Sequence, residues 1–262
     1  MVLAAGRGER MRPLTDTCPK PLLPVQGKPL MQWPLEALAR GGFGQAVVNT
    51  AWLGAQIEAS FGSVLSLQPP QNVREQLSNQ EQEYPPLQIH YSHEGRDFGG
   101  ALETAGGIAR ALPLLCPPGA AQPAPDVFWV LAGDVFAPDF AFSQAAVDRF
   151  VASGQLAHLW LVPNPEHNPK GDFGLRGGLA LNLPPDDPQP RYTYSTIGLY
   201  RAALFAPPWC DIAPGNPHGT KAALAPLLRA AMDQAQVSAE LYTGRWTDVG
   251  TPQRLAQLHL PS

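Results

Sequence analysis

Glycines and arginines are concentrated in one short segment near the start of the chain, directly after an apolar run. Residues 2–5 (VLAA) are typical of a buried strand, and residues 6–12 (GRGERMR) follow with two glycines and three arginines. Glycines allow backbone N–H groups to approach a phosphate closely, and arginines neutralise its charge. The segment lacks the third glycine of a dinucleotide-binding fingerprint and the Gly-Lys-Ser/Thr ending of a P-loop. It therefore predicts a phosphate-binding loop of another kind.

A lysine between two prolines follows this loop. Lys20 lies within residues 19–25 (PKPLLPV), ten residues after Arg10. Proline restricts the backbone on both sides, which favours an oriented side chain. A solvated loop lysine is the more common situation, and this segment taken alone favours it.

Two aspartates lie in segments that are far apart in the sequence. Asp134 follows the apolar run 127–132 (VFWVLA), the most strand-like in the chain, and Asp248 lies within residues 246–251 (WTDVGT). Carboxylates from separate segments can hold Mg²⁺ when substrate phosphates supply its other ligands. An aspartate after a strand is also a common helix cap, so each residue alone leaves both interpretations open.

The elements that must position these residues alternate between strand and helix. This alternation predicts an α/β fold, Rossmann-like, with a mostly parallel central sheet, helices on both faces and a small antiparallel subregion at 174–181 and 194–199. Ligands of such sheets bind at the carboxyl ends of the strands. The expected strands are 2–5, 46–49, 87–92, 127–132, 158–162 and 237–242, and the expected helices are 30–39, 53–61, 104–112 (ended by Pro113), 143–153, 222–233 and 252–259.

Composition narrows the class of protein. The 262 residues carry a net charge of −4 and no long basic run, which argues against a nucleic-acid surface, and no apolar run approaches a membrane span. Three scattered cysteines form no disulfide framework or metal knuckle and suit a reducing cytoplasm. Many of the 30 prolines lie at about 63–86 and 117–125, which we interpret as surface insertions in a single domain spanning 1–262.

Taken together, the first motifs resemble the signature of the sugar-1-phosphate nucleotidyltransferases. The resemblance rests on LAAGRGERMRPLT (residues 3–15), PKPLLPV, the Asp134 strand end and WTDVGT. It implies that Arg10 and Lys20 act on the phosphates and that Asp134 and Asp248 bind Mg²⁺. It also implies that the backbone around Ala4, Ala5, Gly6 and Gly8 binds the nucleotide. The chain departs from the family at Glu9, where threonine is usual.

Further segments are similar to the N-acetylmuramic acid 1-phosphate α-uridylyltransferases of cell-wall recycling. They are AWLGAQIE (51–58), HYSHEG (90–95), ALETAGGI (101–108), NPKGDFGL (168–175), ALAPLLRAAM (223–232) and WTDVGTPQRL (246–255). This resemblance implies that Glu103 and Gly106 lie on the nucleotide side and that Glu103, Asn164 and Asp172 lie near the sugar. Lys170 or Arg176 is then a candidate cation for the lactyl carboxylate of the muramic sugar.

The implied reaction joins UTP and N-acetylmuramic acid 1-phosphate, with Mg²⁺ as cofactor, to give UDP-N-acetylmuramic acid and pyrophosphate. Two alternatives remain: a nucleotidyltransferase for mannose or glucose 1-phosphate with GTP or UTP, and a non-catalytic regulatory subunit that binds nucleotide sugars. An oxidoreductase is disfavoured because no GxGxxG is present. The expected protein is a cytoplasmic monomer or small homo-oligomer without nucleic-acid or membrane partners.

Overall fold

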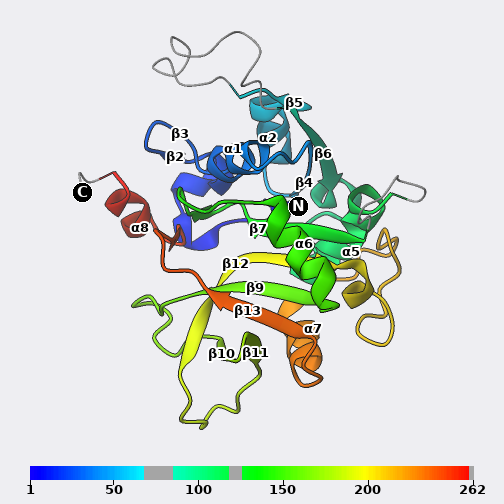
Figure 1. Ribbon diagram of the computed structural model, residues 1–262. Helices are drawn as coiled ribbons and strands as arrows, with labels where there is room; N and C mark the ends of the chain where they lie inside the picture. Colours follow the sequence, from blue (N-terminus) through cyan, green and yellow to red (C-terminus); the bar gives the residue numbers. More distant parts are fainter. Residues whose placement is uncertain (68–84, 118–125, 260–262) are drawn as a thin grey trace, which may run out of the picture.

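The computed structural model describes residues 1–67, 85–117 and 126–259, and its central feature is a ten-stranded sheet (Figure 1). Its strands are β1 (Val2–Leu3), β4 (Gln45–Thr50), β5 (Val64–Leu65), β6 (Leu87–His93), β7 (Val127–Ala132), β9 (Ala157–Val162), β10 (Phe173–Arg176), β11 (Leu179–Leu181), β12 (Arg191–Arg201) and β13 (Val237–Leu241). Their order across the sheet is β10-β11-β13-β9-β12-β7-β1-β4-β6-β5.

The other elements are short helices and two small ladders. The helices are α1 (Gln32–Arg40), α2 (Gly54–Phe61), α4 (Glu94–Phe98), α5 (Glu103–Leu115), α6 (Gln144–Ser153), α7 (Leu224–Met232) and α8 (Pro252–Gln257). The ladders pair β2 (Pro24–Val25) with β3 (Lys28–Pro29) and β8 (Val135–Phe136) with β14 (Thr247–Asp248). None of the helices in these described ranges has the length and apolar character needed to cross a membrane.

The sheet is mixed, so the expectation of a mostly parallel sheet is wrong. β6, β4, β1 and β7 run parallel to one another, as the βαβ alternation predicts. β12 then returns antiparallel to both β7 and β9, and β10 and β11 extend this antiparallel half. The alternation ends after β9, because residues 173–201 form β10, β11 and β12 with no helix between them.

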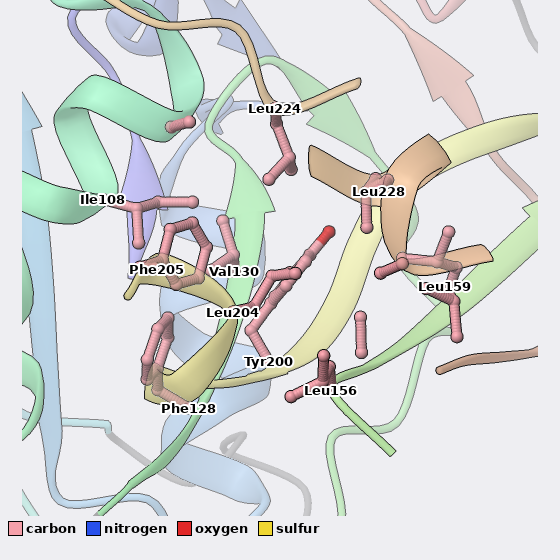
Figure 2. Packing of buried hydrophobic residues seen from close by; sticks show 14 of the residues in the cluster. Ile108, Phe128, Val130, Leu156, Leu159, Tyr200, Leu204, Phe205, Leu224 and Leu228 are labelled. Carbon is pink, nitrogen blue, oxygen red and sulfur yellow. The ribbon is translucent and has the colours of Figure 1, made fainter. Parts of the chain in front are cut away.

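Two apolar layers cover the two faces of the sheet. Side chains alternate between the faces along each strand. On β7, Phe128 and Val130 face α5 and α7, whereas Trp129 and Leu131 face α1, α2 and α6. Figure 2 shows the first of these layers, in which Leu224 and Leu228 of α7 lie with Val130 and Tyr200 of the sheet. This packing fixes α7 against the sheet.

Two local expectations differ from the structure. α5 continues through Pro113 to Leu115 instead of ending before the proline. Pro113 has no N–H for the carbonyl of Ala109, but Gly215 donates to that carbonyl at 2.8 Å, so the helix continues without an unpaired acceptor. The segment interpreted as an insertion at 63–86 begins with β5, which pairs with β6 at the edge of the sheet; residues 68–84 and 118–125 lie outside the described residues.

Candidate active site

The glycine-rich segment forms a compact loop at the carboxyl end of β1. Arg7 donates to the carbonyl of Thr15 at 2.7 Å and to Asp16 at 3.0 Å, and its guanidinium lies 3.5 Å from the centre of the Trp52 ring. Arg12 also donates to Asp16, at 2.9 Å. Two of the three arginines therefore hold the loop together. Arg10 has no carboxylate within 4 Å among the described residues, which leaves its charge available to a ligand.

Gly8 allows the loop to close over Lys20. Its φ of 66° lies in the left-handed region, and a Cβ at this position would lie 3.1 Å from Thr15 and 3.4 Å from Lys20. The hydroxyl of Thr15 donates to the carbonyl of Gly8 at 2.9 Å. Lys20 is buried, and its ammonium forms an ion pair with Asp134. The lysine is therefore oriented, contrary to the solvated state that its own segment favours.

The two aspartates of the sequence motifs are brought together by the β8–β14 ladder. Asp248 lies opposite Val135, and the N–H of Val249 donates to the carbonyl of Asp134 at 2.9 Å. Asp134 follows β7 directly, next to the end of β1, because Gly133 donates to the carbonyl of Leu3 at 2.8 Å. Val249, Leu255 and Phe136 belong to a third apolar cluster, which packs residues of this ladder segment against α8.

A second cationic group lies on the Asp248 side. Arg254 of α8 forms an ion pair with Asp248 and lies 2.7 Å from Nε2 of His167, which itself lies 2.8 Å from Asp248 Oδ1. A Cβ on Gly250 would clash with the Arg254 guanidinium and lie 3.3 Å from that of Arg10. Gly250 therefore leaves the space that the Arg254 guanidinium needs to reach Asp248, with the Arg10 guanidinium close by.

A buried polar network ties the loop to the start of α5. The N–H of Ala4 donates to Asn49 Oδ1 at 2.8 Å, Asn49 Nδ2 donates to Glu94 at 2.6 Å, and the N–H of Leu102 donates to the other oxygen of Glu94 at 2.7 Å. Burial raises the pKa of the Glu94 carboxyl, and the hydrogen bonds from Asn49 and Leu102 partly offset this. The network sets the spacing between the loop and residues 101–107.

A cavity of about 540 Å³ opens beside these elements. Glu103 and Asp172 both line it, and Glu103 begins α5 with a φ of 60°. Asp172 accepts hydrogen bonds from Asn168 at 3.2 Å and from the N–H of Tyr194 at 2.8 Å. Thr196 also lines it, with a φ of 64° and a buried hydroxyl that has no partner among the described residues. A strained residue with an unpaired polar atom in a cavity is typical of a ligand site.

Two other predicted site residues have different surroundings. Asn164 bonds to the loop around it, donating to the carbonyls of Pro169 and Arg191 and accepting from Thr193 at 2.9 Å. The N–H of Gly106 donates to the carbonyl of Ala222 at 3.1 Å, and a Cβ there would lie 2.5 Å from the carbonyl of Thr220. Neither residue lines the cavity.

This geometry coincides with a family match. A family model described as nucleotidyl transferase matches residues 1–176, about two thirds of the chain. The chain belongs to the nucleotidyl transferase family. The match includes the glycine-rich loop, Lys20 and Asp134 and ends before Asp248.

Relatives of this nucleotidyl transferase include an N-acetylmuramate alpha-1-phosphate uridylyltransferase from Neisseria meningitidis serogroup B. It is 43% identical over 268 residues, which cover 98% of this chain and 95% of the relative. A protein of the same name from Caulobacter vibrioides is 38% identical over 115 residues, covering 44% of this chain and 40% of the relative. A putative glucose-1-phosphate thymidylyltransferase from Bacillus anthracis shares the fold, with a TM-score of 0.72 at 18% identity over 98% of this chain and 92% of that one.

The carboxylates of this nucleotidyl transferase suit a hard metal ion. Within the described ranges no group of three or more His, Cys, Asp or Glu side chains forms a metal site on its own. Mg²⁺ is commonly held by one or two carboxylates together with substrate phosphates, and Asp134 and Asp248 are the two carboxylates that the β8–β14 ladder brings together. The sequence analysis assigned no role to Asn49, Glu94, Thr196 or Arg254, although Glu94 and Arg254 lie within quoted motifs. Asn49 bonds to Ala4 and to Glu94, each 45 residues away, and no local pattern reveals such contacts.

Proposed function

We propose that this nucleotidyl transferase transfers the uridylyl group of UTP to N-acetylmuramic acid 1-phosphate, giving UDP-N-acetylmuramic acid and pyrophosphate. The observation that carries the proposal is the 43% identity, along nearly the whole chain, to a relative named for that activity. The meeting of Lys20, Asp134 and Asp248 beside the cavity supports it independently. The reaction would take place in the cytoplasm, as the composition favours.

In the proposed reaction, a phosphate oxygen of the sugar 1-phosphate attacks the α-phosphorus of UTP. A new P–O bond forms, and the bond to the oxygen that bridges the α- and β-phosphates breaks. Pyrophosphate leaves with the electron pair of that bond. The attacking phosphate is already anionic, so no general base is required, and catalysis consists of positioning and charge neutralisation.

Different residues of the chain would stabilise the leaving group, contact the phosphates and hold the metal ion. Lys20 and Arg10 would stabilise the negative charge that develops on the leaving pyrophosphate, which suits a buried oriented lysine and an arginine without a carboxylate partner. The backbone of residues 4–8 would approach the phosphates. Asp134 and Asp248 would hold Mg²⁺, which when bound supplies a Lewis acid that polarises the α-phosphate.

The acceptor sugar would lie in the cavity. Glu103 and Asp172 offer acceptors for its hydroxyl and amide donors. The nucleobase would lie between the small residues of 101–107 and the loop after β1. A pyrimidine is smaller than a purine and would need a less deep pocket there.

The test is a pyrophosphate-release assay with Mg²⁺. Each nucleoside triphosphate is combined in turn with the 1-phosphates of N-acetylmuramic acid, N-acetylglucosamine, glucose and mannose. We expect the highest kcat/KM with UTP and the muramic sugar, and loss of that activity in Asp134→Asn. A higher kcat/KM with another pair would support the same enzyme class but show that the substrate is a different one. No turnover with any pair, together with tight binding of nucleotide sugars, would favour a regulatory subunit.

A further inference from the structure

The cavity holds one cation that the sequence analysis did not single out. Arg229 of α7 lines it, whereas Lys170 and Arg176 are exposed and do not. Arg229 is the one positively charged residue among the described residues that line this cavity, alongside the carboxylates of Glu103 and Asp172.

The Arg229 side chain is held in place by its neighbours but is paired with no acidic side chain among the described residues. Its Nη1 donates to the side-chain oxygen of Asn182 at 2.8 Å, and its guanidinium lies 5.2 Å from the centre of the Phe173 ring. No carboxylate oxygen in the described part of the chain lies within 4 Å of it. A half-buried arginine held by a neutral amide and an aromatic ring is a ready site for an anion with a planar, two-oxygen face.

The surroundings of Arg229 also match the rest of a lactyl group. Leu224, Leu228 and Phe173 form an apolar wall next to it. A lactyl ether combines a methyl group with a carboxylate, so it needs an apolar surface and a cation side by side. Glu103 and Asp172 would repel that carboxylate, and Arg229 is the side chain among the described lining residues that would attract it.

We propose that Arg229 determines specificity by binding the lactyl carboxylate of the acceptor sugar. This inference rests on the proposed function, since it takes the muramic sugar as the acceptor. Lys20, Arg10, Asp134 and Asp248 do not line the cavity, so Arg229 is separate from the groups assigned to the phosphates of UTP.

The test compares two acceptors that differ by the lactyl group. With UTP, kcat/KM is measured for the 1-phosphates of N-acetylmuramic acid and N-acetylglucosamine in the wild type, Arg229→Gln and Arg229→Lys. Losing a charge-assisted, two-point hydrogen bond should lower kcat/KM for the muramic sugar roughly a hundredfold in Arg229→Gln, mainly through KM. The value for the other sugar should change less than about threefold, because a hydrogen bond that this sugar never makes costs it nothing.

Arg229→Lys keeps the charge and loses the planar fork, so it should retain part of the preference. Arg176→Gln is the matched control and should leave both values unchanged, because Arg176 is exposed on the β10–β11 turn and does not line the cavity. An equal fall for both sugars in Arg229→Gln would overturn the proposal and assign Arg229 to the 1-phosphate that both share. A wild type that prefers another acceptor would instead reject the proposed function.

Discussion

Replacing Asn49 with alanine should test whether the buried network holds the glycine-rich loop in place. Asn49 is 3% exposed, and its side chain joins the N–H of Ala4 to the carboxylate of Glu94. Both of these partners are buried, and Glu94 is fully inaccessible to solvent. The change therefore leaves one backbone donor and one carboxylate oxygen without a partner in the interior.

The size of the effect follows from these two groups. Each buried polar group left unpaired costs about 1–3 kcal/mol, so Asn49→Ala should lower the free energy of unfolding by about 2–6 kcal/mol. For a chain of this length, each kcal/mol corresponds to roughly 2–4 °C in melting temperature, which gives a fall of roughly 4–24 °C.

Urea denaturation at neutral pH measures the free energy of unfolding, and an unchanged m-value would show that the unfolded state is comparable. Asn182→Ala is the matched control, since Asn182 bonds to Asp233 and Arg229 where water can replace it, and we expect a loss within about 0.5 kcal/mol. A loss for Asn49→Ala no greater than that of the control would refute the reasoning and show that other groups satisfy Ala4 and Glu94.

Three further predictions concern the site. Asp134→Asn and Asp248→Asn should each remove most turnover while the protein still folds, because each removes a proposed Mg²⁺ ligand; wild-type rates at ordinary Mg²⁺ would exclude that role. Lys20→Ala and Arg10→Ala should each lower kcat roughly a hundredfold or more, since they would act on charge that develops in the transition state; a change confined to KM for the sugar phosphate would contradict this. Burial raises the pKa of Glu94 above its ordinary value of 4.5. Between that value and the higher pKa of the folded state, the folded protein therefore binds more protons than the unfolded protein. The stability of the wild type relative to Glu94→Gln should therefore fall with rising pH through that window, as urea denaturation at several pH values would show; a relative gain would reverse the assigned shift.

The sequence was a good guide to local elements. The expected strand 127–132 is β7 with the same bounds, and Ser143 and Thr251 cap α6 and α8 through side-chain hydrogen bonds. These features depend on residues within a few positions of one another, so periodicity and capping chemistry reveal them.

The sequence was a poorer guide to the direction of the strands and to the contacts between distant side chains. The reversal of β12 between β7 and β9 makes the sheet mixed, and no local pattern along residues 191–201 specifies which strands it will join. In the same way, Arg7, Arg10 and Arg12 look alike in the loop. Asp16 and Trp52 contact Arg7 and Asp16 contacts Arg12, whereas Arg10 has no carboxylate within 4 Å among the described residues.

The sequence by itself therefore determined the α/β class, and it marked the loop as a candidate phosphate-binding segment and the two aspartates as candidates for a shared site. Only the tertiary structure decided that Lys20 pairs with Asp134, that the β8–β14 ladder joins the two aspartates, and that Arg229 rather than Lys170 or Arg176 faces the cavity. The physical reason is the range of the interactions. Side-chain chemistry and periodicity are local properties, whereas a contact across a hundred residues exists only once strand order and packing have fixed which backbone segments lie side by side.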